Sequence, residues 1–281
     1  MRIQYASDLH LELWLKTTFD ETLEPKADYL VLCGDIAKLN NPNLRAFLEY
    51  VSERWKKIFW IPGNEEIWKI SDIPTYSLYK MEELVSPYRN IHILYKKTYL
   101  LEEGVEKLLL VGLSLWHKPR NNAMLKYHNN YYIKAIQTPV DEHIFRKEHN
   151  DQIQFLEKII KNSTYPILIA SYYSPFTWYN EEDYIQEPKD AVVDRDVEKL
   201  ITYPIIAWIC GHNHLPFEYT RRYSLPDGYE GSVLFVSNPR GKPKQNPYYR
   251  TEAVVRLSPS SLVGFEPSIP EEVPSWATKN S

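Results

Sequence analysis

The sequence predicts an α/β fold with a parallel sheet, because buried strands alternate with longer connections in its N-terminal part. Three short apolar runs are typical of strands, at residues 2–6, Tyr29–Cys33 and Ile58–Ile61. A polar loop joins the first two runs, and a helical pattern joins the second and third. Strands joined by helices or long crossovers pair in parallel, which favours the α/β class.

Each of these three strands ends in a polar motif. The motifs are Ser7–His10, Gly34–Asp35 and Gly63–Glu66. A fourth apolar run, Ile205–Cys210, ends at Gly211–His214, which offers two imidazoles two residues apart. Because α/β proteins place their sites at strand ends, we expect these polar groups to form one site.

A helix is predicted between the second and third strands. Asn41 is typical of an N-cap, and Pro42 is suited to the first helical position. Apolar residues then recur at helical spacing, namely Leu44, Phe47, Leu48, Val51 and Trp55.

The middle of the chain is less regular. A second helix is predicted near Ser77–Val85, and Glu103–Glu106 is typical of a hairpin turn between strands at Tyr99–Glu102 and Lys107–Leu115. The segment Trp116–Phe145 is rich in Asn, Tyr, His and Lys and shows little periodicity. Long loops are often functional, so we expect substrate specificity to lie in this segment.

Regular patterns return in the second half. A helix at Glu148–Lys161, a buried strand at Pro166–Ala170 and a short helix at Val193–Ile201 precede the fourth apolar run. Beyond that run the pattern becomes antiparallel, with strands at Val233–Val236 and Ala253–Leu257.

Composition and charge exclude several classes of protein. Of the 281 residues, 43% are hydrophobic and 25% are charged, as in ordinary globular proteins. A formal net charge of -4 and a pI near 6.1 argue against nucleic-acid binding by bulk charge. No signal peptide or membrane helix is recognisable, so we expect a cytoplasmic protein without a membrane partner. Cys33 and Cys210 are too few for a disulfide framework and are interpreted as buried thiols.

Seven side chains at the strand ends are candidate metal ligands. They are Asp8, His10, Asp35, Asn64, Tyr172, His212 and His214. Oxygen and imidazole donors together suit Mn, Fe or Zn better than Ca or Mg. A carboxylate shared by two ions holds them about 3.5–4 Å apart, and such a pair binds a phosphoryl oxygen and makes hydroxide at neutral pH. We therefore predict one or two divalent ions of Mn, Fe or Zn.

The order of these motifs resembles that of the calcineurin-like metallophosphoesterases. The family pattern is Asp-x-His, Gly-Asp, Gly-Asn-x-Glu and Gly-His-x-His. It stands here as Asp8/His10, Gly34-Asp35, Gly63–Glu66 and Gly211–His214, and the resemblance covers nearly the whole chain. Softer matches point to a branch seen in bacteria and large DNA viruses, at Met1–Glu12, Leu115–Trp116, His149 with Phe155–Leu156, and Asn238–Gly241.

The resemblance implies a fold and a set of ligands. The fold would be a two-sheet β-sandwich flanked by helices, in four layers, over residues 1–265, with a C-terminal tail at 266–281. The ligands implied are Asp8, His10 and His214 for the first metal, Asn64 and His212 for the second, and Asp35 as the bridge between them.

Two positions depart from the family pattern. The family has a histidine in Gly-Asn-His-Glu that helps to protonate the leaving group; here that position is Glu65, either a catalytic acid or a solvated loop carboxylate. The family also has a histidine ligand to the second metal after the strand that ends near Ala170, and here that position is Tyr172. As a phenolate ligand Tyr172 would suit Fe(III), but we favour a packed tyrosine.

Four further residues have two interpretations each. His117, His128 and His143 could replace the missing histidine, although a solvated loop histidine is the default for each. Arg240 could anchor a phosphate or form a structural salt bridge.

Two functional hypotheses follow. In the first, the protein hydrolyses phosphate mono- or diesters by a metal-activated water, with activity reduced by the altered second site. In the second, it is a catalytically inactive member of the fold, kept as a binding or structural module. The substrate would contain phosphate, but neither its identity nor the oligomeric state follows from the sequence.

Overall fold

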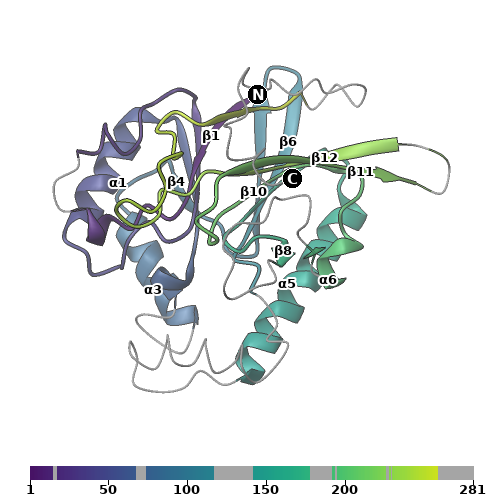
Figure 1. The fold of residues 1–281 in the computed structure, drawn as a ribbon, viewed down its shortest axis with the longest axis horizontal. Coiled ribbons are helices and arrows are strands. Elements are labelled where there is room, and N and C mark those ends of the chain that lie inside the picture. The colour runs from purple at the N-terminus through teal and green to yellow at the C-terminus, as the bar shows by residue number, and fades with distance from the viewer. Residues whose placement is uncertain are drawn as a thin grey trace, which may run out of the picture.

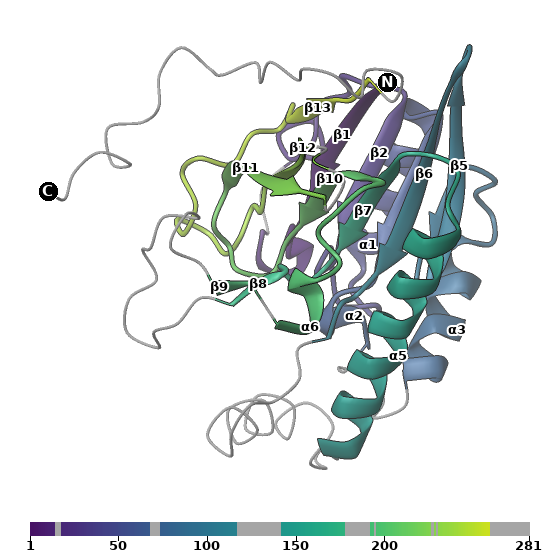
Figure 2. The same cartoon turned by 90° about the vertical axis from the view of Figure 1, so that its right-hand side faces the viewer.

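The computed structural model describes residues 1–14, 18–67, 74–116, 142–177, 192–193, 195–225, 228 and 230–258. Two larger sheets stack face to face, with helices on both outer faces (Figure 1). Helices α1 (Asn43–Arg54) and α3 (Pro74–Val85) cover one sheet, and α5 (Glu142–Asn162) and α6 (Arg195–Glu198) lie outside the other (Figure 2). This order of layers confirms the predicted four-layer α/β sandwich.

The first sheet has five strands in the order β13-β1-β2-β3-β4. Strands β1 to β4 are parallel to their neighbours, and β13 pairs antiparallel with β1. The bounds are β1 Arg2–Ala6, β2 Tyr29–Cys33, β3 Lys57–Ile61, β4 Ile91–Ile93 and β13 Val254–Arg256. The pairing of β1, β2 and β3 confirms the parallel sheet predicted from the three N-terminal runs.

The second sheet has six strands in the order β11-β12-β10-β7-β6-β5. The four central strands are parallel, and β5 and β11 are antiparallel edge strands. The bounds are β5 Lys97–Glu103, β6 Glu106–Leu113, β7 Ile167–Ser171, β10 Ile205–Cys210, β11 Phe217–Ser224 and β12 Glu230–Ser237. The predicted hairpin is therefore confirmed as β5-β6, with Gly104 at φ 60° in its turn.

All four predicted helices differ in their bounds. Helices α3 and α5 begin earlier than predicted, at Pro74 and Glu142, so the end of the segment predicted to be irregular is helical from Glu142. The first helix begins at Asn43 rather than Pro42, because Asn41 Oδ1 accepts the Asn43 N–H at 2.8 Å and Pro42 takes the N-cap position. The helix predicted at Val193–Ile201 is wrong over much of its length. Val193 instead pairs with Phe176 in the small sheet of β8 (Phe176–Thr177) and β9 (Val192–Val193), so helix α6 has only four residues.

Strand β2 shows how alternating side chains build two cores. Val31 and Cys33 pack with residues of both sheets, whereas Leu30 and Leu32 pack with residues of α1. All four side chains are fully buried. A strand that is apolar on both faces is typical of a parallel sheet covered on both sides, and this arrangement explains the continuous apolar run in the sequence.

The loops that follow the parallel strands meet at one edge and are joined across the two sheets. Ser7, after β1, forms a bridge with Pro239, after β12. The Arg240 N–H donates to the Ser7 carbonyl at 3.0 Å, and the Gly241 N–H donates to the Asp8 carbonyl at 2.9 Å. These backbone bonds fix the positions from which the candidate ligands project.

Several predictions from the sequence lie outside the described residues. These are most of the segment Trp116–Phe145, with His117 and His128, and the tail at 266–281. His143 is described and lies exposed on α5. Two short helices complete the described elements, η1 (Leu11–Leu13) and α2 (Asn64–Ile67). Among the described helices, none combines the length and apolar character needed to cross a bilayer.

Gly34 tests how tightly the two sheets pack beside the site. Its φ is 75°, and a Cβ there would lie 2.2 Å from Tyr172 Cδ2. We expect Gly34→Ala to lower the free energy of unfolding by about 2–5 kcal/mol, through left-handed strain and overpacking together. Urea denaturation measures this change.

Gly104→Ala is the matched control, because Gly104 has φ 60° and no atom lies within 4 Å of the position that a Cβ would take there. It should cost only the backbone strain, on the order of 1–2 kcal/mol. Equal losses in the two variants would contradict close packing of Tyr172 on Gly34.

Candidate metal centre

Five of the candidate ligands have left-handed backbone conformations. Their φ angles are 50° at Asp8, 43° at His10, 51° at Asp35, 72° at His212 and 52° at His214. Such conformations are uncommon outside glycine, cost on the order of 1–3 kcal/mol each, and cluster at functional sites. Here they occur in the loops after β1, β2 and β10, where the chain turns sharply at the sheet edge.

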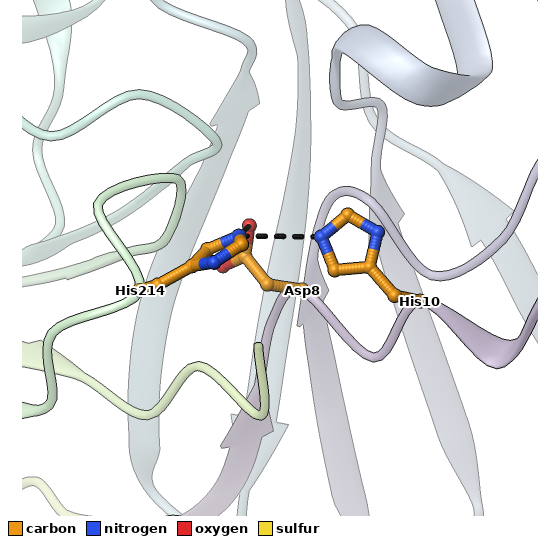
Figure 3. Close-up of side chains that lie close together, drawn as sticks. All are labelled: Asp8, His10 and His214. Carbon is orange, nitrogen blue, oxygen red and sulfur yellow. Dashed lines mark hydrogen bonds and ion pairs between the residues drawn. The ribbon is translucent and has the colours of Figure 1, made fainter. Parts of the chain in front are cut away.

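Asp8, His10 and His214 form a compact cluster where the loops after β1 and β10 meet (Figure 3). The two histidine Nε2 atoms are 3.2 Å apart, and Asp8 Oδ1 lies 3.3 Å from His214 Nε2. One ligand atom from each residue lies within 4.8 Å of the others. The cluster therefore offers two nitrogens and one oxygen that could hold a metal ion.

Both imidazoles are oriented by a partner on the other ring nitrogen. His10 Nδ1 lies 3.3 Å from Glu12 Oε1, and His214 Nδ1 lies 2.7 Å from Gln245 Oε1. Gln245 Oε1 also accepts the Lys242 N–H at 2.9 Å, which identifies it as the acceptor oxygen. Each Nδ1 therefore donates its hydrogen, so a neutral imidazole here carries its lone pair on Nε2. Burial lowers the pKa of both histidines, but Glu12 beside His10 and Asp8 beside His214 outweigh it, and both pKa values are raised. Two facing lone pairs repel unless a proton or a metal ion lies between them, and metal-ligating histidines are held by such partners on the other ring nitrogen.

The carboxylate of Asp8 also fits a cation. Its Oδ2 accepts the Ser7 hydroxyl at 2.6 Å and the His212 N–H at 3.0 Å. Its Oδ1 is buried, and its polar neighbour is His214 Nε2 at 3.3 Å, with no shorter hydrogen bond among the described residues. Burial opposes ionisation, but the positive charge that His214 and His10 carry when protonated and the Ser7 hydroxyl outweigh it, and the pKa of Asp8 is lowered. A buried carboxylate oxygen needs a proton donor or a cation, so a metal ion bound beside His214 would satisfy it.

The remaining three ligand candidates surround a phenol. The Tyr172 hydroxyl lies 2.6 Å from Asp35 Oδ2, 2.6 Å from Asn64 Oδ1 and 2.9 Å from His212 Nδ1. Tyr172 is 1% exposed, as expected for the packed tyrosine that the sequence analysis favoured over a phenolate ligand. Burial and the Asp35 carboxylate raise the pKa of Tyr172 well above its usual value, which favours the neutral phenol.

Asp35 is held on both oxygens. Oδ1 accepts the Glu65 N–H at 2.9 Å, and Oδ2 faces the Tyr172 hydroxyl. Burial and the neighbouring Glu66 raise the pKa of Asp35 well above its usual value. Glu65 itself is buried rather than solvated, at 3% exposure, and its Oε1 accepts from Asn64 Nδ2 at 3.4 Å.

Arg240 lies beside the cluster. Its guanidinium stacks over Trp14 at 3.8 Å from the ring centroid, and the side chain is largely buried. Within the described part of the chain its Nη1 has no hydrogen-bond partner. The backbone of the next residue, Gly241, approaches the His214 ring, because a Cβ there would lie 3.5 Å from Nδ1. A largely buried guanidinium with an N–H group that lacks a partner is suited to an anion, and the Arg240 backbone adjoins the cluster.

The family follows from a comparison with known proteins. Residues 1–216 match the family model described as calcineurin-like phosphoesterase. The chain belongs to the calcineurin-like phosphoesterase family. The resemblance predicted from the four motifs is thereby confirmed, and the family implies divalent metal ions at the site just described.

Two curated relatives and one solved structure illustrate the similarity. An uncharacterized protein of Acanthamoeba polyphaga mimivirus is 26% identical over 283 residues, covering 88% of this chain and 95% of the relative. The [acyl-carrier-protein] phosphodiesterase PptH of Mycobacterium tuberculosis is 33% identical over 70 residues, covering 24% of this chain and 21% of the relative. A provisionally assigned 5'-nucleotidase from Staphylococcus aureus is 12% identical, covers 84% of this chain and 48% of that chain, and has a TM-score of 0.39.

Four supporting residues of this calcineurin-like site were not predicted from the sequence to have a role of their own. They are Ser7, Glu12, Glu66 and Gln245, which orient ligands or loops without being ligand candidates themselves. Ser7 and Glu66 stand inside the motifs, where a search for hydrogen-bonding neighbours could have found them. Gln245 carries no sequence signal, because it lies in a loop 31 residues after its partner His214.

The first cluster can be tested by metal binding without any assay of activity. We expect Mn²⁺ or Zn²⁺ to raise the melting temperature of the wild type, since a ligand of the native state stabilises it. His214→Ala should abolish most of this rise and most of the bound metal measured by elemental analysis. His92→Ala is the control, because His92 lies on β4 in contact with Phe59 and Tyr99. Equal metal-induced shifts in all three proteins would contradict the assignment.

Proposed function

We propose that the protein is a metal-dependent phosphoesterase that acts in the cytoplasm on phosphate mono- or diesters, with its rate limited by an altered second site. The observation that carries this proposal is the cluster of Asp8, His10 and His214. There the Nε2 atoms of two imidazoles and the buried Oδ1 of Asp8 converge at the sheet edge. The donor set suits Mn, Fe or Zn.

Each residue of the site has a distinct part in this chemistry. A divalent ion, when bound, polarises a phosphoryl oxygen and lowers the pKa of water. Asp8, His10 and His214 would hold that ion, and Glu12 and Gln245 keep the histidine lone pairs directed at it. The guanidinium of Arg240 would bind phosphoryl oxygens, which it can contact with two parallel N–H groups.

Protonation of the leaving group is the weak step of the proposed reaction. The family's histidine would be a cationic donor, whereas Glu65 is an acid that places negative charge beside an anionic substrate. General acid catalysis contributes on the order of 10²–10⁴-fold, so its loss would slow turnover strongly. We infer that the protein favours substrates whose leaving group needs no proton.

The alternative function is that of an inactive binding or structural module with this fold. One observation favours it: the Tyr172 hydroxyl stands among three residues that the family uses for the second metal. The first cluster favours the enzyme. A module that needs no metal would have no reason to retain two histidines that face each other beside a buried carboxylate.

Hydrolysis of an aryl phosphodiester in excess Mn²⁺ tests the proposal, and the described activity of the mycobacterial relative makes a diester the first choice. We expect slow turnover that EDTA abolishes. Changing Glu65→His together with Tyr172→His should raise the rate by about 10²-fold or more, because it restores a general acid and a ligand.

Two results would contradict this proposal. No metal-dependent turnover in either protein would favour the inactive module. Rapid wild-type turnover that falls in the double variant would show that Glu65 and Tyr172 are working parts of a different mechanism.

The proposed role of Arg240 has its own test. Arg240→Lys keeps the charge but loses the paired N–H groups, so we expect KM to rise about tenfold or more with kcat little changed. Arg54→Lys is the matched control, because Arg54 ends helix α1 at the surface. Among the described residues, its guanidinium interacts with Tyr50 and Glu53. An unchanged KM in Arg240→Lys would exclude phosphate binding by Arg240.

A further inference from the structure

We propose that the Tyr172 hydroxyl takes the place of the second metal ion, so that the site holds a single ion at Asp8, His10 and His214. The inference deepens the proposed function and rests on it for the first ion only. It concerns the other half of the site, where Asp35, Asn64 and His212 surround the phenol.

The distances around the Tyr172 oxygen are those of hydrogen bonds. Ligand atoms about 2.0–2.2 Å from one ion lie roughly 2.8 Å or more from each other at the usual coordination angles. The Tyr172 oxygen is closer than this to both Asp35 Oδ2 and Asn64 Oδ1, at 2.6 Å each. The Tyr172 oxygen is therefore too close to these two atoms to be a further ligand of the same ion. It occupies the point on which the three side chains converge.

The hydrogen bonds also occupy the atoms that an ion would need. Asn64 Oδ1 and Asp35 Oδ2 share the Tyr172 hydroxyl hydrogen, and His212 Nδ1 is directed at the same oxygen. The second oxygen of Asp35 is held by the Glu65 N–H at 2.9 Å. Both oxygens of Asp35 are therefore already hydrogen-bonded. This disfavours the role of Asp35 as a bridge between two ions, which the family resemblance implied.

Tyr172 cannot easily move aside. Its ring packs on Gly34, where a Cβ would lie 2.2 Å from Cδ2. The rings of Tyr173 and His212 contact it edge-on, with centroids 4.9 Å and 5.0 Å away. Its backbone is also fixed, because its carbonyl accepts the Gly211 N–H at 3.0 Å. Admission of an ion would require this whole packed group to shift.

The count of bound ions tests the inference without any assay of activity. Protein freed of metal by chelation is titrated with Mn²⁺, and bound metal is measured by elemental analysis after gel filtration. We expect one equivalent in the wild type and two in Tyr172→His, where an imidazole replaces the phenol. Electron paramagnetic resonance should show an isolated Mn²⁺ in the wild type and a coupled pair in Tyr172→His.

Two controls separate the hydroxyl from general effects of mutation. Tyr173→Phe makes the same kind of change on the neighbouring buried ring and should still bind one equivalent. Tyr172→Phe removes only the hydroxyl and keeps the ring on Gly34, so it shows whether loss of the hydroxyl alone admits a second ion. Two equivalents in this variant would support exclusion by the hydroxyl, whereas one equivalent would overturn the role of the hydroxyl and assign exclusion to the ring.

Other outcomes would overturn the inference in distinguishable ways. Two equivalents in the wild type would contradict it and leave the proposed function intact. Visible charge-transfer absorption after loading with Fe(III), absent in Tyr172→Phe, would show that Tyr172 is a phenolate ligand instead. No metal in the wild type would contradict the proposed function. In that case a gain of metal by Tyr172→His would still support exclusion by Tyr172, and no gain would overturn it.

Discussion

The arrangement of the site depends on one buried carboxylate that is not a ligand candidate. Glu66 accepts the N–H groups of Gly63, Asp35 and Ile36, at 2.8, 3.0 and 2.7 Å. Burial raises the pKa of Glu66 to about 7, and these donors partly offset that effect. Loss of the carboxylate would leave buried N–H groups unpaired, at about 1–3 kcal/mol each. The loops after β2 and β3 are therefore one unit, from which Asp35 and Asn64 project together.

The apolar runs were sufficient to predict a parallel sheet and the gathering of the motifs, whereas the two-sheet, four-layer arrangement came from the family resemblance. The runs at Tyr29–Cys33 and Ile58–Ile61 are apolar on both faces, which is what a covered parallel sheet requires. Parallel strands place their carboxyl ends at one edge, so Asp8 and Asp35 had to lie near each other. His214 follows one further buried strand, Ile205–Cys210, and was therefore expected at the same edge.

The direction of individual side chains could not be predicted in this way. Two carboxylates and three histidines at strand ends are compatible with one shared site or with two separate clusters. Which of them arises depends on left-handed turns such as those at Asp8 and His212, and on distant partners such as Gln245. The sequence marked Tyr172 as a departure from the family, but its hydrogen bonds depend on loops from three other strands, which only the assembled fold brings together.

The two halves of the site differ in where their hydrogens lie. Around Asp8, the histidine Nδ1 hydrogens are directed outward to Glu12 and Gln245, so the neutral imidazoles that bind a metal present their Nε2 lone pairs inward. Around Tyr172, a hydroxyl hydrogen lies among the inward-facing oxygens of Asp35 and Asn64 and satisfies them. A group of inward lone pairs is stabilised by a cation, whereas a group that already shares a hydrogen gains less from one and must first break its hydrogen bonds. The same ligand types can therefore favour a metal ion in one half and a phenol in the other, within one site of the same fold.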